Sequence, residues 1–158
     1  MKIRLICVGK MKNAPLRALA EDYAGRIQRF APLEIVELKD GKAGDAVSRL
    51  AEEAKAIEAA LLRDTRGAGF RNAVLWDERG DAPDTLAFSR FLDKGLQKGA
   101  SLDFVLGSSH GVDPELKKKI PSHLKLSALT LTHEWARALS LEQVYRAFCV
   151  LKGFPYHH

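Results

Sequence analysis

The loop at positions 107–111, with the sequence GSSHG, carries the residue types whose spacing most directly indicates chemistry. It follows an apolar run and matches G-x-S-x-G, the pattern in which α/β-hydrolases present a nucleophilic serine, here Ser109. Those enzymes place an acid and then a histidine later in the chain. Asp113 is too close to Ser109 to reach around a histidine, which leaves Glu134 and Glu142 as the later acids to consider. The loop therefore supports a hydrolase only weakly.

The same loop suits the close approach of a flat ligand to the backbone. Gly107 stands where a strand is expected to end, and Gly111 allows a sharp return of the chain. The glycine patterns that hold nucleotide triphosphates or dinucleotides are absent from the sequence, so neither a P-loop enzyme nor an NAD enzyme is expected. The alternative interpretation is an ordinary glycine-rich turn.

A second candidate is a strand-like segment in which small and hydroxylated residues stand among leucines. Its backbone end is suited to hydrogen bonding with an adenine edge, while two of its leucines flank the ring. The alternative is an ordinary core strand. The segment consists of Leu126, Ser127, Ala128, Leu129, Thr130 and Leu131.

Histidines and cysteines give little support for a metal site. His110 and His133 stand in expected loops, and no two histidines share the H-x-H or H-x-x-x-H spacing that zinc sites on one element use. Cys7 and Cys149 are far apart and each lies within an apolar run, so both are expected to be inert core thiols. No metal is therefore predicted.

The elements that position these residues alternate between strand and helix along the whole chain. Such alternation predicts a single α/β domain, residues 1–158, with a largely parallel sheet. Ligands of such sheets bind outside the carboxyl ends of the strands, which here means after Trp76, Leu106 and Leu131. The expected strands are 1–8, 33–38, 73–77, 102–106 and 124–131. The expected helices are 15–30, 47–61 with Val47 on its inward face, 85–98 with Asp84 as its N-cap, 114–120, and a last one that Thr132 caps and Gly153 ends.

Composition narrows the class of partner. Lysine and arginine number 25 against 20 acidic residues, which gives a net charge of +5 and a pI near 9.3. That surplus suits a polyanion such as RNA. No apolar run approaches the length of a membrane span, and the first strand-like run begins at Lys2, which leaves no room for a signal peptide. We therefore expect a cytoplasmic protein.

Several segments, taken together, resemble one family. They are KIRLICVG at 2–9, LSALTLTH at 126–133, Arg137, EQVYRA at 142–147 and GFPYH at 153–157. These segments and the chain length strongly resemble the small SPOUT methyltransferases of the ribosomal pseudouridine N3 type. Because the segments come from both ends of the chain, the resemblance spans its whole length.

The resemblance implies a fold, a cofactor and a substrate. It implies an α/β fold with helices on both faces and a C-terminal trefoil knot, a homodimer, and S-adenosylmethionine as methyl donor. The implied reaction is N3-methylation of a pseudouridine in 23S rRNA, within the assembled ribosome. Carried over by position, the cofactor contacts fall at Trp76, at Gly107 and at the stretch from Leu126 to Leu131.

Three further residues are expected near the target base, where the C-terminal tail of one subunit approaches the cofactor of the other. Arg137 is expected to stabilise the deprotonated imide electrostatically. His157 is a candidate proton acceptor because the ordinary pKa of histidine lies near neutrality. Tyr156 is expected to hydrogen-bond to the base or stack on it.

Four positions depart from the usual pattern of the family. Ser108 stands where a second glycine is common, Thr132 where proline is common, Trp76 where an aliphatic residue is usual, and His158 where lysine or arginine is usual. Two alternatives stay open: a SPOUT methyltransferase for another RNA base, and a non-catalytic RNA-binding factor of ribosome assembly. Cofactor binding separates an enzyme from such a factor.

Overall fold

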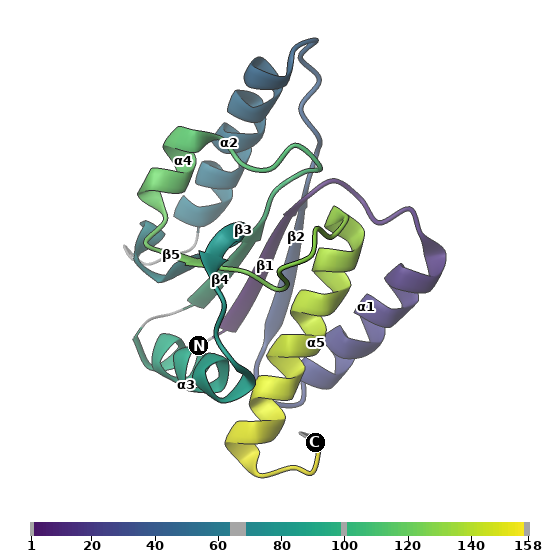
Figure 1. Ribbon diagram of the computed structural model, residues 1–158, viewed down its shortest axis with the longest axis vertical. Helices are drawn as coiled ribbons and strands as arrows, with labels where there is room; N and C mark the ends of the chain where they lie inside the picture. Colours follow the sequence, from purple (N-terminus) through teal and green to yellow (C-terminus); the bar gives the residue numbers. More distant parts are fainter. Residues whose placement is uncertain (1, 64–68, 99–100, 157–158) are drawn as a thin grey trace.

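Five parallel strands form the sheet in the computed structural model, which describes residues 2–63, 69–98 and 101–156 (Figure 1). Their order is β2-β1-β4-β3-β5, and every pairing between neighbours is parallel. This confirms the predicted α/β class with a parallel sheet. The strands are β1 (Lys2–Val8), β2 (Leu33–Leu38), β3 (Ala73–Asp81), β4 (Ser101–Leu106) and β5 (Ser122–Leu124).

Helices cover both faces of this sheet, as predicted. On one face lie α1 (Ala14–Ile27), α3 (Thr85–Lys98) and α5 (His133–Lys152), which share one apolar core. On the other face lie α2 (Ala46–Leu62) and α4 (Pro114–Lys119), which share a second core. A 3₁₀ turn, η1 (Gly69–Asn72), precedes β3. Among the described residues no helix is both long and apolar enough to cross a membrane.

The central strand β1 supplies side chains to both cores. Ile3, Leu5 and Cys7 belong to the core on the α5 face, whereas Ile6 and Val8 belong to the core on the α2 face. Successive side chains of a strand point to opposite faces, so a strand covered on both sides must be apolar throughout. The apolar run at the start of the sequence is thus explained by two-sided burial.

One charged pair interrupts this apolar interior. Arg4 of β1 and Asp103 of β4 are each 1% exposed, and Arg4 Nε donates to Asp103 Oδ1 over 2.8 Å. Arg4 Nη1 also donates to the carbonyl oxygens of Ala60 and Arg63, over 2.9 and 3.1 Å, at the end of α2. A buried charge is tolerated only when it is paired and hydrogen-bonded, so this cluster ties two strands and a helix end into one arrangement.

Local capping follows the sequence prediction. The Asp84 carboxylate accepts from Ala87 N over 2.7 Å at the start of α3, and the Thr132 hydroxyl accepts from Trp135 N over 3.3 Å at the start of α5. Gly153 ends α5 in the left-handed conformation, with φ of 69°. All three predicted caps are confirmed.

Two predicted details of the helices were wrong: the end of the first helix and the burial of Val47 in the second. The first helix was predicted to continue to Phe30, but α1 ends at Ile27, because Phe30 N bonds back to Ile27 O in a tighter turn ahead of Pro32. Val47 was placed on the inward stripe of the second helix, yet its side chain is 77% exposed in the first turn of α2.

Candidate functional site

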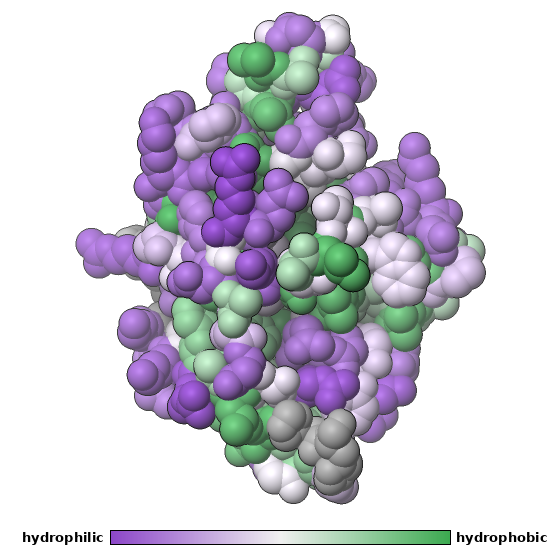
Figure 2. Space-filling view, viewed as in Figure 1, coloured by the Kyte–Doolittle hydropathy of each residue, from purple (hydrophilic) through white to green (hydrophobic). Residues whose placement is uncertain are grey.

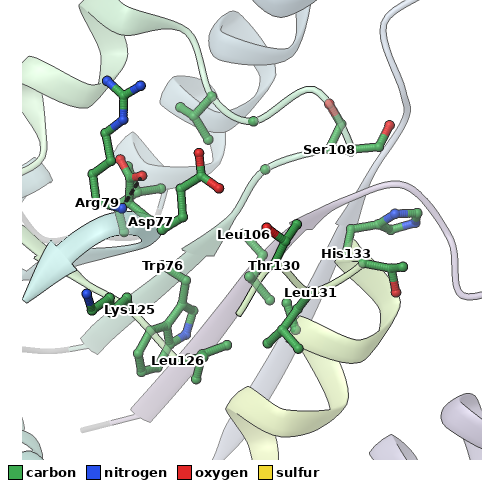
Figure 3. Close-up of a pocket in the computed structure, with 18 of the residues that line it drawn as sticks. Trp76, Asp77, Arg79, Leu106, Ser108, Lys125, Leu126, Thr130, Leu131 and His133 are labelled. Atoms are coloured by element: carbon green, nitrogen blue, oxygen red, sulfur yellow. Dashed lines mark hydrogen bonds between the residues drawn. The ribbon is translucent and has the colours of Figure 1, made fainter. Parts of the chain in front are cut away.

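A pocket of about 510 Å³ opens at the carboxyl ends of β3 and β4, which is the edge of the sheet that the sequence indicated (Figure 3). Its volume lies in the range of small-molecule sites. Four parts of the chain form its wall: the end of β3, the loop after β4, α4, and the segment that leads into α5. Its lining includes Trp76, Asp77, Arg79, Gly107, Ser108, Lys117, Lys125, Leu126, Ser127, Leu129, Thr130, Leu131 and His133.

The segment from 125 to 131 is irregular, which corrects the prediction of a strand over 124–131. β5 ends at Leu124, and Lys125 N makes a last bond to Asp81 O over 2.8 Å. Beyond that point the Ser127 hydroxyl accepts from Leu129 N over 2.9 Å. A serine that bonds to its own local backbone competes with a sheet ladder. Within the described residues the sheet therefore does not continue past β5, and the segment borders the pocket instead.

The loop after β4 turns back sharply at the pocket edge. Gly111 N donates to Ser108 O over 2.9 Å, and Gly111 has a φ of +86°, a conformation that L side chains rarely adopt. A Cβ at Gly107 would collide with the Gly111 carbonyl oxygen and with Val112. Both glycines are therefore required by this turn, which confirms the reading of the loop as a tight return.

Trp76 lies at the border between the pocket and the core. Its ring stacks on Phe104, with centroids 5.5 Å apart and an angle of 11° between the planes, and it also contacts Phe88. In Figure 3 its indole lies beside Leu126 at the base of the pocket. Its Nε1 is buried and has no hydrogen-bond partner in the described structure. An unsatisfied buried donor is costly, and this one belongs to a residue that lines the pocket.

A charged pair stands on another wall of the pocket and was not foreseen from the sequence. Lys117 Nζ lies 2.8 Å from Asp77 Oδ2, and Arg79 N donates to Asp77 Oδ1 over 3.1 Å. Burial opposes ionisation of Asp77, but the bonds from Lys117 and Arg79 prevail and hold its pKa below the ordinary value. The only sequence signal was that Asp77 follows Trp76 at a strand end.

The hydrolase reading gains no support from the geometry of the loop. The Ser109 hydroxyl lies 3.3 Å from Nδ1 of His110, which is its neighbour in the chain, and both side chains are exposed. In the described part of the chain, no carboxylate is hydrogen-bonded to His110, so the group that would orient a catalytic histidine is missing. The same residues contain no cluster of three or more potential metal ligands from histidine, cysteine, aspartate and glutamate.

Arg137, predicted to act near the target base, does not line the pocket of its own chain. It lies on α5 and is 8% exposed, and its Nη2 is 2.7 Å from Glu37 Oε1 on β2. Its Nε is buried without a partner. The neighbouring helical turn, with His133 and Ala136, does reach the pocket. Arg137 is therefore close to the pocket along α5, in the layer between α5 and the sheet.

Tyr156 follows α5 in the chain, and its side chain packs back against that helix. Its hydroxyl is 3.0 Å from the Tyr23 hydroxyl and donates to Glu142 Oε1 over 3.3 Å, while Arg146 lies over its ring at 4.7 Å from the centroid. Burial, together with the bond to Tyr23 and the nearby Glu142 charge, raises the pKa of Tyr156 above its ordinary value. His157 lies outside the described residues.

The structure thus brings together most of the predicted cofactor residues, whereas Arg137 and Tyr156 do not line the pocket of their own chain. Of the cofactor set, only Ala128 is absent from the pocket lining, and it is exposed. Tyr156 packs back against α5, on Tyr145 and within reach of Glu142, and it is not among the residues that line the pocket. One chain therefore does not place Tyr156 at its own pocket.

Comparison with known proteins gives a consistent result over the full length. The family model described as "Predicted SPOUT methyltransferase" matches residues 1–157. The chain is 35% identical over 159 residues to a protein of Geobacter sp. strain M21, and the match covers 100% of this chain and 99% of that protein. It is 41% identical over 164 residues to one of Rhodopseudomonas palustris strain HaA2, covering 99% of each. Both relatives are named "Ribosomal RNA large subunit methyltransferase H".

Proposed function

Because the chain belongs to the SPOUT methyltransferase family, we propose that it is an S-adenosylmethionine-dependent rRNA methyltransferase that methylates N3 of a pseudouridine in 23S rRNA. The observation that carries the proposal is the pocket between the loop 107–111 and the segment 126–131. The ribosome is the proposed setting, which corresponds to a cytoplasmic enzyme. The trefoil knot implied by the resemblance stays a prediction.

The residues of the pocket fit the proposed cofactor. The segment 126–131 lies outside the sheet ladder, so its backbone groups other than Leu129 N, which bonds to the Ser127 hydroxyl, are available to an adenine edge. Leu126 and Trp76 offer apolar surface beside an unsatisfied indole N–H, and Gly107 has no side chain to hold a ligand away from the backbone. Bound S-adenosylmethionine would supply an electrophilic methyl group. The pocket walls would fix its orientation relative to the base, which is a large part of catalysis when the reagent is already reactive.

We assign the remaining steps to the groups expected near the base. The charge of Arg137 favours the deprotonated imide of the pseudouridine, and the bond to Glu37 fixes the position of its guanidinium. His157 accepts the proton from N3, and Tyr156 contacts the base. These roles rest on the resemblance to the family.

A homodimer would allow the pocket at the start of α5 and the tail that follows its end to act on the same base. Tyr156 packs against Glu142 of its own α5 and does not line its own pocket, so we propose that the tail enters the pocket of a second subunit. Hydrophobic side chains are exposed at both ends of this helix: Leu129 and Trp135 are 79% and 53% exposed, and Phe154 is 55% exposed. Figure 2 shows such apolar surface interrupting the hydrophilic surface near the middle of this face and at its lower end. A second copy that covered it would remove that surface from water.

The experiment that tests the proposal is calorimetric titration of the full-length protein with S-adenosylmethionine and, separately, with its demethylated product. We expect saturable binding with one site per subunit, or one per dimer if the tails make the sites unequal. Absence of binding by the folded protein would contradict the enzyme and favour the RNA-binding assembly factor. After binding is established, mapping of the methylated nucleotide on ribosomes separates pseudouridine N3 from another base.

A further inference from the structure

A buried carboxylate on α2 contacts the pocket loop from behind. Glu53 is 3% exposed, although it lies near the apolar residues Ala54 and Ile57 of the core on that face. Its Oε2 accepts from the Ser108 hydroxyl over 2.8 Å, and its Oε1 accepts from Gly41 N over 3.0 Å. A buried carboxylate is costly unless it is hydrogen-bonded. Glu53 therefore holds the Ser108 hydroxyl and the Gly41 N–H firmly in place.

The Ser108 hydroxyl is engaged on both sides. It donates to Glu53 and accepts from His110 N over 3.3 Å. A hydroxyl has one proton to donate, so the bond to Glu53 leaves its lone pairs turned toward the His110 N–H. The turn from Gly107 to Gly111 is therefore held from inside by Ser108 O, which bonds Gly111 N, and from behind by Glu53. This turn is a wall of the pocket, and Figure 3 shows Ser108 at the upper rim.

We propose that Glu53 is a positioning residue for cofactor binding, which acts through the Ser108 hydroxyl to set the place of the loop 107–111. The inference rests on the proposed function, because it takes the pocket to be the cofactor site. Glu53 does not line the pocket. Its effect therefore reaches the ligand only through the loop, and it belongs to the binding step rather than to methyl transfer.

The adjacent residue provides a matched control. Glu52 accepts from Lys42 N and Ala43 N, over 2.8 and 3.3 Å, and so holds the same 41–43 loop that Glu53 reaches through Gly41. In the described part of the chain Glu52 makes no hydrogen bond to Ser108, and its side chain is exposed. A change at Glu52 thus tests the 41–43 loop and the loss of one carboxylate, without the contact to the pocket wall.

The test uses the full-length protein and four variants: Ser108→Ala, Glu53→Gln, the double variant and Glu52→Gln. S-adenosylhomocysteine is titrated well below the melting temperature of each. We expect Ser108→Ala and Glu53→Gln each to weaken binding roughly five- to tenfold, the loss of a hydrogen bond to a charged group. The double variant should bind S-adenosylhomocysteine no more weakly than the single variant with the lower affinity, since both substitutions break the same contact between Ser108 and Glu53. Glu52→Gln should change the affinity less than about twofold.

Turnover separates positioning from general damage. In methylation assays, Ser108→Ala should raise KM for S-adenosylmethionine by the same factor and leave kcat within about twofold, as expected for lost binding that is equal in ground and transition states. Wild-type affinity in Ser108→Ala, independent effects that multiply in the double variant, or equal weakening in Glu52→Gln would overturn the proposal.

Hydrogen exchange distinguishes failure of this inference from failure of the proposed function. If the wild-type protein binds neither ligand, the function is contradicted, but the tether is still measurable. The amides of His110 and Gly111 should then exchange faster in Glu53→Gln than in Glu52→Gln, because the turn has lost its hold. Equal exchange rates in the two variants would show that Glu53 does not position the loop.

Discussion

The two ends of α5 serve the proposed reaction in different ways. At its start, residues of one chain form the pocket, and one of them, Trp76, has a buried Nε1 that no group in the described part of the chain satisfies. Past its end, Tyr156 is satisfied by its own chain, through Tyr23 and Glu142. The first end is arranged to receive a ligand. The second is a closed set of contacts that holds the last described residues against the helix.

This difference indicates a division of labour between binding and chemistry. A cofactor site that is complete in one chain predicts that affinity for the cofactor does not depend on the tail. If, as proposed, the tail supplies its groups to the pocket of a second subunit, turnover should depend on the tail.

The largest expected effect comes from the tail. His157→Ala should lower methylation by roughly a hundredfold, the usual loss when a proton acceptor is removed, while calorimetry shows unchanged cofactor affinity. His158→Ala is the matched control and should have a much smaller effect. Weaker cofactor binding by His157→Ala would break the comparison, because the tail would then belong to the pocket.

The pocket end should respond to an added methyl group. Gly107→Ala places a Cβ against the Gly111 carbonyl oxygen, so the turn must open, and we expect cofactor affinity to fall at least about tenfold. Gly44→Ala is the control, since a Cβ there meets nothing within 4 Å. Circular dichroism and melting curves of both variants check that they fold. Normal cofactor binding by folded Gly107→Ala would remove this turn from the site.

Mixed dimers test whether the two ends work in different subunits. When the Gly107→Ala and His157→Ala chains are refolded together in equal amounts, half of the dimers are mixed and each has one site with an intact pocket and an intact tail. Activity should therefore recover to about a quarter of the wild-type value. The separate variants, mixed without refolding, are the control. No recovery in verified mixed dimers would mean that pocket and tail act in one chain.

The smallest expected effect is a difference in pH dependence between the two ends. The pKa of Asp77 is lowered from 3.8, so its contribution to stability is present above pH 3.8 and is lost as pH falls through the folded-state pKa. The pKa of Tyr156 is raised from 10.0, so its contribution is present below pH 10 and is lost as pH rises toward the folded-state pKa.

Urea unfolding across pH measures both contributions by difference. The stability gap between wild type and Asp77→Asn should shrink at acid pH, and the gap between wild type and Tyr156→Phe should shrink above pH 10, each by about 1 kcal/mol or less. A gap that stays constant across either range would mean that the residue concerned has the same pKa in the folded and unfolded chains.

The fold was largely predictable because its signals are local. The run at the start of β1, the caps at Asp84 and Thr132 and the terminal glycine at 153 each act within a few residues. The predicted strand over 124–131 was wrong. Hydrophobic periodicity carries no information about the hydrogen bond that Leu129 N donates to the Ser127 hydroxyl, and this local bond replaces pairing in the sheet.

The site was predictable only in part. Glycines and the 126–131 segment gave the pocket wall, since the carboxyl ends of parallel strands fix where a ligand lies. The partners that orient this wall were not visible, because Lys117 is 40 residues from Asp77 and Ser108 is 55 from Glu53. Such pairs meet only once the sheet order is known.

The position of β1 in the sheet has a consequence for the order in which the chain can fold. β1 lies between β2 and β4, and its Arg4 is paired with Asp103, 99 residues away. During synthesis the first strand can join β2 early, but its other edge and its buried guanidinium must wait until β4 has been made. Long-range pairings of this kind slow folding and leave strand edges exposed in the meantime. The newborn chain is therefore expected to stay open to proteases and to misplaced strand pairing until β4 completes the middle of the sheet.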